Sequence, residues 1–371
     1  VVVSEPLPVV APDAAIQIQF TSGTTGLPKG ALLTHRAMVT NAAYLADRAG
    51  VDQDVWVTPM PLFHTAGSGL CVLGCAARLS TVVLPWLFDP KLMLTTIEAE
   101  RATVTSGVPT MLVAMLEALE AEPRDLSSLQ VAISGGAPVP PDLHERVEAR
   151  FGCPLVSLFG QTELSPSLCA TGPDDSTRDR ATTSGRPLPQ VEVRIIDPST
   201  RMIVAVGAEG EVQARGYQVM AGYIGQPEAT ARTIASDGWL STGDVGRLDS
   251  RGYLQITGRL SDMIIRGGEN LYPAEIEAAL MRHPAVVEVA VFGLPDDRWG
   301  EIPVAAMRLR PDGIPPTADE LKAHCRGHLA PHKTPVVWYL VEAMPLTPSG
   351  KVQKYSLHDR ALRGTLARIT T

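Results

Sequence analysis

The chain has 371 residues, of which 45% are apolar and 19% are charged, a composition typical of a globular protein too long for one hydrophobic core. The formal net charge of −8 and the lack of any Lys/Arg run exclude a general nucleic-acid-binding protein. Five scattered cysteines, an odd number, argue against a disulfide framework. We expect a cytoplasmic protein, because no apolar run reaches the ~18 residues of a transmembrane segment and the N-terminal residues lack the basic start of a signal peptide.

The first half of the chain alternates strand-like and helix-like segments. Residues 16–20 (IQIQF) alternate as a strand does, and Thr34 is typical of the cap of a helix that spans residues 35–49 and ends at Gly50. Pro109 and Pro141 stand where helices begin. Further strands are expected at residues 55–60, 79–84, 103–107, 129–135 and 155–159. This order predicts an α/β fold with a doubly wound, mostly parallel sheet covered by helices on both faces.

The second half has two further patterns. Short β segments separated by Gly and Pro predict a β-rich, antiparallel or barrel-like subdomain at about 186–258. Beyond Arg259 a compact α+β pattern follows, with helices expected at 273–282 and 317–329 and strands at 286–294, 302–310 and 336–341. We therefore divide the chain into a large domain, 1–259, and a small C-terminal domain, 260–371.

The loop Thr21–Gly30 (TSGTTGLPKG) directly follows the first expected strand. It holds three Gly, four hydroxyl residues and one Lys. Gly lets backbone N–H groups approach phosphate oxygens closely, the hydroxyls add donors, and Lys29 adds positive charge. The spacing differs from the common P-loop, because Pro28 stands before the Lys and Gly30 after it. The alternative is a flexible, hydroxyl-rich turn, but the composition after a strand favours a phosphate site.

Five further segments carry a resemblance. The loop and these segments resemble, in order, the motifs of the adenylate-forming superfamily, in its acyl-CoA synthetase (fatty-acid–CoA ligase) branch. The segments are SGGAPV at Ser134–Val139, FGQTE at Phe159–Glu163, GWLSTGDVGRLD at Gly238–Asp249, GRLSDMIIRGGENLYPAEIE at Gly258–Glu277 and PSGKV at Pro348–Val352. Taken singly, Asp244 is typical of a turn, Glu163 of a helix start and Lys351 of a solvated surface, so only the ordered set favours a site.

The resemblance implies that a carboxylic acid attacks the α-phosphate of Mg-ATP to form an acyl-adenylate, from which the thiol of coenzyme A then displaces AMP. It assigns the β- and γ-phosphates of ATP to Thr21, Ser22, Gly23, Thr24, Thr25, Gly26 and Lys29. It assigns adenine to Gly135, Gly136, Ala137, Pro138, Phe159, Gly160 and Gln161, with the Phe159 ring stacked on the base. Thr162 would bind the α-phosphate and Glu163 the Mg²⁺ ion. Asp244 and Arg259 would bind the ribose, and Lys351 would stabilise charge in the first step.

The resemblance also implies that the small domain is mobile and presents two faces to one site. Lys351 faces the site during adenylation, and Gly267 and Gly268 line a pantetheine tunnel during thiolation. The pivot position holds Ser261, where relatives commonly carry Asp or Lys. His332 stands where relatives often have Tyr, and Lys333 is a further candidate phosphate or CoA contact. Trp299 fits a segment near the CoA channel, with a core residue as the alternative.

The resemblance also implies an acyl pocket with His64 at its mouth and Gly69 in its lining, although a lone His beside apolar residues is more often a structural histidine. Small residues follow His64, and they allow either room for a long apolar chain or close helix packing. A medium- to long-chain fatty acid is the first hypothesis, and an aryl acid or transfer to a carrier protein are alternatives. Only 20 residues precede the loop, so we expect a chain truncated at its N-terminus, and a nucleotide-binding form without full turnover stays open. The expected partners are the acid, ATP and CoA, and a homodimer is also left open.

Overall fold

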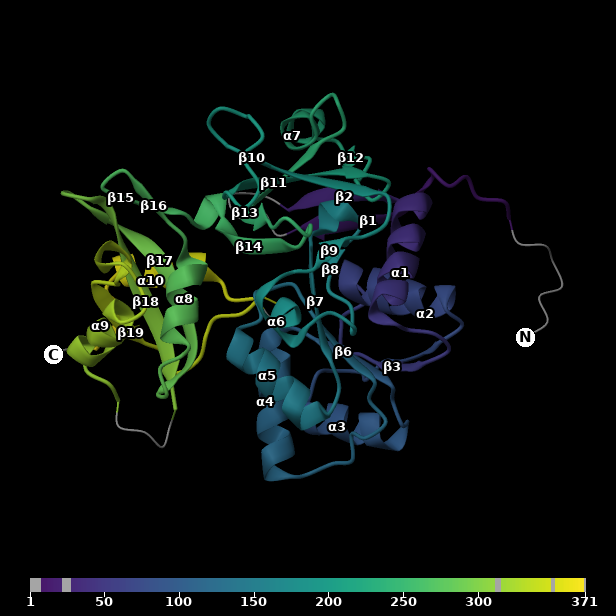
Figure 1. Cartoon of the computed structure of the whole chain (residues 1–371), viewed down its shortest axis with the longest axis horizontal. Coiled ribbons are helices and arrows are strands. Elements are labelled where there is room, and N and C mark those ends of the chain that lie inside the picture. Colours follow the sequence, from purple (N-terminus) through teal and green to yellow (C-terminus); the bar gives the residue numbers. More distant parts are fainter. Residues whose placement is uncertain (1–7, 22–27, 311–314, 348–350, 370–371) are drawn as a thin grey trace.

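The computed structural model describes residues 8–21, 28–310, 315–347 and 351–369. Figure 1 shows two lobes. The large lobe, up to Arg259, contains three sheets with their helices, and the small lobe, from Leu260, contains one sheet with its helices. Among the described residues no helix is long and apolar enough to cross a membrane.

The main sheet of the large lobe has seven strands in the order β4-β3-β5-β6-β7-β8-β9. Pairing is parallel from β4 to β7 and antiparallel for β8 and β9. The strands are β3 (Val55–Val57), β4 (Thr81–Val83), β5 (Val104–Gly107), β6 (Val131–Ser134), β7 (Leu155–Gly160), β8 (Ser167–Ala170) and β9 (Arg186–Pro187). The predicted α/β class and the mostly parallel sheet are confirmed.

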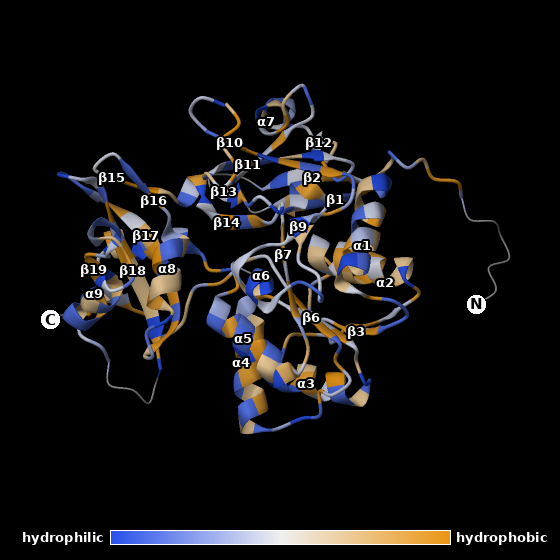
Figure 2. Ribbon diagram, viewed as in Figure 1, coloured by the Kyte–Doolittle hydropathy of each residue, from blue (hydrophilic) through white to orange (hydrophobic). Residues whose placement is uncertain are grey.

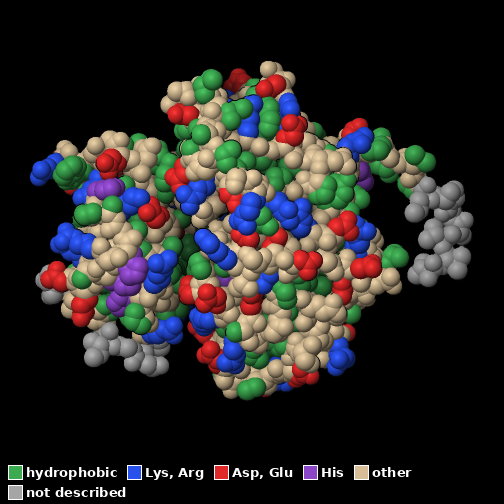
Figure 3. All heavy atoms as spheres, in the orientation of Figure 1, with side chains coloured by type: hydrophobic (Ala, Val, Ile, Leu, Met, Phe, Trp, Pro, Cys, Tyr) green, Lys and Arg blue, Asp and Glu red, His purple; other side chains and the backbone are tan. Residues whose placement is uncertain are grey.

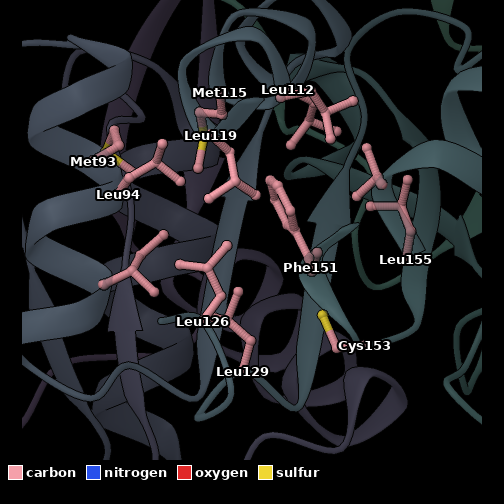
Figure 4. Packing of buried hydrophobic residues seen from close by; sticks show 14 of the residues in the cluster. Met93, Leu94, Leu112, Met115, Leu119, Leu126, Leu129, Phe151, Cys153 and Leu155 are labelled. Atoms are coloured by element: carbon pink, nitrogen blue, oxygen red, sulfur yellow. The ribbon is translucent and has the colours of Figure 1, made fainter. Parts of the chain in front are cut away.

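Helices cover both faces of this sheet because its strands are apolar on both sides. One core contains Val57, Ala132 and Leu155 with side chains of α3 (Pro90–Ala99), α4 (Pro109–Ala121) and α5 (Pro141–Phe151) (Figure 4). The residues one position away on the same strands, such as Trp56 and Val156, belong to a second core with α1 (His35–Ala49). The alternation therefore sends each strand's side chains to two helical layers, and Figure 2 shows the apolar strands between amphipathic helices.

Local signals set several helix ends as predicted. The Thr34 side chain accepts a hydrogen bond from Ala37 N at the start of α1, and Gly50 ends that helix in the left-handed conformation at φ 73°. Pro109 and Pro141 are the first residues of α4 and α5.

Two features of the large lobe were not predicted. Residues Ala66–Leu73 form a π-helix, η1, which continues as α2 (Gly74–Ala77). A separate three-stranded antiparallel sheet joins β1 (Ala15–Thr21), β2 (Lys29–Thr34) and β12 (Gly222–Tyr223). The phosphate-loop candidate therefore connects the two strands of a hairpin.

The β-rich subdomain is a four-stranded antiparallel sheet in the order β10-β11-β13-β14. Its strands are β10 (Val191–Ile196), β11 (Gly210–Gly216), β13 (Leu240–Leu248) and β14 (Leu254–Arg259). The short elements nearby are η2 (Thr162–Leu164), α6 (Thr177–Thr182) and α7 (Pro227–Thr233). The antiparallel prediction for this region is confirmed.

The small lobe is an α+β unit around one mixed sheet, β16-β15-β18-β19-β20, with β17 also paired to β18. The strands are β15 (Ile264–Arg266), β16 (Glu269–Leu271), β17 (Val286–Asp296), β18 (Gly300–Leu309), β19 (Val337–Leu340) and β20 (Ala367–Arg368). The helices are α8 (Pro273–Leu280), α9 (Ala318–Arg326) and α10 (Lys354–Leu362), with 3₁₀ turns η3 (Leu260–Asp262) and η4 (Pro331–Lys333). The predicted division at 259/260 falls where β14 of one sheet ends and η3 begins, and it stays an interpretation of the sequence.

The two lobes meet along a seam that Figure 3 shows from outside. Near the crossover a Cβ at Gly258 would lie 2.8 Å from Tyr272 Cδ1, so Gly258 is needed for close approach of β14 to the start of α8. Figure 1 also shows the segment before α10 reaching from the small lobe to the large lobe near β7 and α6. This segment carries Lys351.

Candidate active site

The phosphate loop begins and ends on paired strands. Thr21 and Lys29 are partners in the β1–β2 ladder, and the Thr21 hydroxyl lies 3.4 Å from the Lys29 carbonyl oxygen. The predicted phosphate residues Ser22, Gly23, Thr24, Thr25 and Gly26 lie outside the described residues. The Lys29 ammonium lies 5.0 Å from the centroid of the Tyr223 ring. The hairpin thus fixes the two ends of the loop.

The predicted adenine segment follows β6 at the carboxyl end of the parallel strands, where α/β sheets generally bind ligands. A Cβ at Gly135 would lie 2.5 Å from Leu158 Cδ1, so the backbone lies directly on β7. Gly136 adopts φ 80°, and a Cβ there would be 3.7 Å from Lys351 Cε. Ala137 and Pro138 are exposed, which leaves this turn open to a ligand.

The segment Phe159–Glu163 begins in the last two residues of the neighbouring strand β7 and continues into η2. Phe159 is half-buried against the core of the β-rich subdomain. Gly160 is required for packing, because a Cβ would lie 1.9 Å from the Pro166 carbonyl oxygen. Gln161 precedes η2, which carries Thr162 and Glu163, and all three side chains are partly exposed. The sheet therefore places the adenine and metal candidates side by side.

Asp244 and Arg259 are partners in the β13–β14 ladder. Arg259 Nε donates to Asp244 Oδ1 at 2.7 Å, and Asp244 is only 2% exposed. Burial raises the pKa of the Asp244 carboxyl, and the Arg259 charge opposes that shift. The second oxygen, Oδ2, is buried without a hydrogen-bond partner among the described residues. A buried acceptor without a donor is costly, and a ribose hydroxyl is a donor that would satisfy it.

Lys351 reaches this group from the small lobe. Burial lowers the pKa of the Lys351 ammonium and the Arg259 charge lowers it further, whereas the charges of Asp244 and Glu163 raise it. Gly136 is also adjacent to the Lys351 side chain. Motifs that are more than 200 residues apart in the sequence therefore lie near the same amine. The structure brings together Lys351, Glu163, Asp244 and Arg259 as one electrostatic group.

His64 lies close enough to Lys351 to feel its charge. Burial and the Lys351 charge lower the pKa of the His64 imidazole to about 4, so the ring is neutral near neutral pH. His64 Nδ1 accepts a hydrogen bond from Ala66 N at 3.1 Å, which leaves the proton on Nε2. His64 is therefore a neutral ring whose Nε2–H remains a donor.

The second acyl-pocket candidate, Gly69, is closely packed. A Cβ at Gly69 would lie 2.9 Å from Met38 Cε on α1, and one at Gly67 would lie 2.3 Å from the Pro61 carbonyl oxygen. The small residues of η1 thus permit close packing here, which was one of the two alternatives. A pocket role for Gly69 stays a prediction.

The predicted CoA residues do not lie with this group. Gly267 and Gly268 form the two-residue turn between Arg266 and Glu269 of the β15–β16 hairpin, at φ 60° and 86°. Such turns require positive φ at both positions, which explains both glycines locally. A Cβ at Gly267 would lie 3.0 Å from Trp299 Cε3, and Trp299 is 40% exposed, so the core alternative for this Trp is wrong.

The remaining candidates of the small lobe have local partners. His332 Nε2 lies 3.0 Å from Glu269 Oε2, and Lys333 Nζ lies 2.6 Å from Glu275 Oε2. The hinge candidate Ser261 lies in η3 and donates from its hydroxyl to Asp262 Oδ1 at 3.0 Å. Their predicted roles in binding and rotation stay predictions.

One site residue was missed from the sequence. The Tyr223 hydroxyl donates to Glu163 Oε1 at 2.7 Å. Tyr223 stands 60 residues from Glu163, in a strand of only two residues, so no periodicity announces it. The Gly-Tyr pair close after the β11 strand was the available signal.

The predicted magnesium site is compatible with this geometry. Among the described residues there is no group of three or more His, Cys, Asp or Glu side chains that could hold a metal. Mg²⁺ commonly keeps its waters and binds one or two carboxylates together with substrate phosphates. Tyr223 contacts both the Glu163 carboxylate and Lys29 at the end of the phosphate loop. Glu163 therefore fits this mode of binding.

Comparison with known proteins decides the family. Residues 3–224 match the family model of the AMP-binding enzymes, and residues 275–351 match that of the AMP-binding enzyme C-terminal domain. The chain belongs to the AMP-binding enzyme family. The predicted phosphate, adenine and magnesium residues and Lys351 lie within these two matched ranges, whereas Asp244, Arg259, Ser261 and Gly267–Gly268 lie between them.

Relatives in this family are named as acyl-CoA synthetases or ligases. The chain is 44% identical over 352 residues to the putative acyl-CoA synthetase YngI of Bacillus subtilis (strain 168), which covers 94% of this chain and 64% of YngI. It is 39% identical over 355 residues to the medium-chain acyl-CoA ligase ACSF2, mitochondrial, of Homo sapiens, covering 94% and 58%. The chain thus spans less than two thirds of the length of these relatives.

Solved structures of the family resemble the whole described chain. The ATP-bound structure of MatB from Rhodopseudomonas palustris has a TM-score of 0.88 at 32% identity, covering 96% of this chain and 70% of that one. The apo structure of the same protein has a TM-score of 0.76 at 31% identity, covering 98% and 71%. The arrangement of this chain is therefore more similar to the ATP-bound form.

Proposed function

We propose that this chain carries the active-site machinery for ATP-dependent activation of a carboxylic acid, with transfer of the acyl group from the adenylate to coenzyme A. The observation that supports this most directly is the position of Lys351. An amine from the small lobe is buried among Asp244, Arg259, Glu163 and the adenine turn at Gly136.

The first half-reaction follows from this arrangement. The carboxylate of the acid attacks the α-phosphorus, the bond to the bridging oxygen of pyrophosphate breaks, and negative charge builds between the two. Lys351 lies where an ammonium would stabilise that charge, and Thr162 offers a hydroxyl to the α-phosphate. Asp244 and Arg259 hold the ribose through the Asp244 Oδ2 acceptor. Mg²⁺ at Glu163 would neutralise phosphate charge when bound.

His64 contributes a neutral donor beside the reacting groups. Because its Nδ1 is occupied by Ala66 N, only Nε2–H is free to donate. A donor at this position fits a carboxylate oxygen of the acid. The low pKa of about 4 keeps the imidazole from adding a second positive charge next to Lys351.

The second half-reaction would use a different face of the small lobe. The Gly267–Gly268 turn and Trp299 lie beside a groove of about 560 Å³, and Arg266 belongs to both regions. The groove is lined by four basic residues, Arg266, Lys322, Arg326 and Arg368, against one acidic residue, Asp319. This charge suits the phosphates of coenzyme A. Rotation of the small lobe would bring this face to the adenylate and exclude water from it.

A medium-chain fatty acid is the proposed acid. The Homo sapiens relative is named a medium-chain acyl-CoA ligase, and the residues of η1 after His64 carry no charge. Aryl acids are the second candidate class, because His64 also suits a short ring-bearing acid.

The test is acid-dependent exchange of pyrophosphate into ATP by the protein. We expect exchange with saturated medium-chain acids, and acyl-CoA detected by mass when coenzyme A is added. Absence of exchange across fatty and aryl acids would refute the proposed function.

A further inference from the structure

Tyr223 lies between Glu163 and Lys29. It is 9% exposed, and its hydroxyl donates to Glu163 Oε1 at 2.7 Å. Among the described residues this is the one hydrogen bond to the Glu163 carboxylate. The phenol therefore fixes one carboxylate oxygen and leaves Oε2 for a cation.

The segment around Tyr223 also holds the Glu163 backbone. Met220 N donates to the Glu163 carbonyl oxygen at 2.9 Å. The residues after Met220 are joined to β2, because Ala221 N donates to Leu32 O at 2.9 Å and Ile224 N donates to Gly30 O at 2.8 Å. The segment Met220–Tyr223, which pairs with β2 of the phosphate hairpin, thus holds Glu163 at both its backbone and its side chain.

The face of the Tyr223 ring contacts the other charged group of this region. Lys29 Nζ lies 5.0 Å from the ring centroid, within the range of a cation–π interaction. One rigid ring therefore separates a cation at its face from a carboxylate at its hydroxyl. The ring position itself is fixed by the β12–β2 ladder and by a hydrogen bond from Tyr223 N to Thr230 Oγ1 at 2.9 Å.

We infer that Tyr223 is a positioning residue that sets the separation and orientation of Glu163 and Lys29, so that the carboxylate binds a divalent cation already bound to the phosphates of ATP. This inference rests on the proposed function only in taking ATP as the ligand of the hairpin.

Tyr223→Phe tests the inference with the smallest change. The variant keeps the ring, its packing and its contact with Lys29, and it removes only the donor to Glu163. We would measure binding of Mn²⁺ by electron paramagnetic resonance in the presence of ATP, and binding of ATP alone in EDTA, both without acid or coenzyme A. Loss of a side chain that orients a metal ligand typically weakens metal affinity by about 10- to 100-fold. We expect at least a tenfold loss for Mn²⁺ and unchanged affinity for metal-free ATP.

Tyr253→Phe is the matched control, because it removes a similarly buried phenol that donates to Asp175 Oδ1 at 2.5 Å beside the β13–β14 turn. It should leave both affinities unchanged. Equal Mn²⁺ affinity in Tyr223→Phe and wild type would overturn the inference, and so would a parallel loss of metal-free ATP binding. A wild-type chain that binds no Mn²⁺ with ATP would also overturn it. A chain that binds Mn²⁺·ATP but activates no acid would refute the proposed function alone.

Discussion

The small lobe carries two family motifs, of which one is close to the large lobe and the other is not. Lys351 is partly buried, and the charges of Arg259, Asp244 and Glu163 in the large lobe act on its ammonium. The Gly267–Gly268 turn has its neighbours within the small lobe, and a Cβ at Gly268 would meet no atom within 4 Å. One motif is thus engaged with the site and the other is not.

This difference shows what a single arrangement of the lobes can and cannot explain. Lys351 is near Asp244, Arg259 and Glu163 only because the two lobes are in contact. Both glycines, in contrast, are already explained by the positive φ of their turn. A role for the turn in thiolation therefore requires that the small lobe move. The higher TM-score with ATP-bound than with apo MatB is consistent with an adenylation arrangement.

Lys351→Ala should have the largest effect. Removal of one group that stabilises transition-state charge typically costs about 10²- to 10³-fold in rate, and we expect this loss in acid-dependent pyrophosphate exchange. Thiolation from a preformed acyl-adenylate should be nearly unchanged, because Lys351 leaves the site in that step. Lys354→Ala is the control, since Lys354 pairs with Glu277 at 2.7 Å within the small lobe. Equal losses in both half-reactions would contradict the two-face account.

His64 should make stability depend on pH. Its pKa falls from 6.5 in the unfolded chain to about 4 in the fold, so the folded state binds fewer protons between these values. Stability is then full above pH 6.5 and is lost as the pH falls toward 4, by up to about 3 kcal/mol. Denaturant unfolding across this range should show a shallower loss for His64→Gln. If stability fell equally with pH in both proteins, the pKa of His64 would not be lowered by burial and the Lys351 charge.

Asp244→Asn should weaken recognition of the ribose. A hydrogen bond to a charged group is worth about 1.5–3 kcal/mol, so we expect roughly a 10- to 100-fold loss of ATP affinity. Wild type should discriminate against 2′,3′-dideoxy-ATP and the variant should not, as measured by calorimetry. Asp249→Asn on the same hairpin, where Asp249 pairs with Arg251, is the control. Unchanged discrimination in Asp244→Asn would show that Oδ2 does not bind the ribose.

Gly268→Ala should have the smallest effect and should affect the second step. Its Cβ is free in the present arrangement, so adenylation should be spared, while thiolation should slow by about tenfold, less than the ~100-fold of a full 1 Å misplacement. Gly252→Ala is closely matched, with φ 81° against 86° and open space around both. Both variants should lose similar stability, about 1 kcal/mol. Equal kinetics in the two would remove the turn from the thiolation step.

Local features of the fold were predictable from sequence, and pairings between distant segments were not. Thr34, Gly50, Pro109 and Pro141 act through their own backbone, and each marks the helix end that the sequence indicated. The strand β2 was missed because Lys29 and Gly30 were interpreted as part of the phosphate loop. Its pairing with β12 joins residues nearly 200 positions apart, which no periodicity can show.

The same holds for the candidate site, where motifs were predictable from sequence and contacts between distant residues were not. The ordered motifs predicted that Lys351, Glu163, Asp244 and Arg259 share one site, and the structure brings these four together. The sequence left open whether Gly69 is pocket or packing, because its contact, Met38, lies on another helix. Tyr223 was missed because its role depends on its contact with Glu163. The two residues are 60 positions apart, and strands of two other sheets lie between them in the sequence.

The movement of the small lobe is tested most directly by a distance measurement. All five cysteines are buried, so Cys introduced at the exposed Glu269 and Glu145 can be spin-labelled selectively. With Mg-ATP alone the distance between the labels should match the present arrangement. With a non-hydrolysable acyl-adenylate analogue and coenzyme A, a shorter distance should appear as the Gly267–Gly268 turn reaches the site. One unchanged distance in both states, in a protein that forms acyl-CoA, would contradict the account.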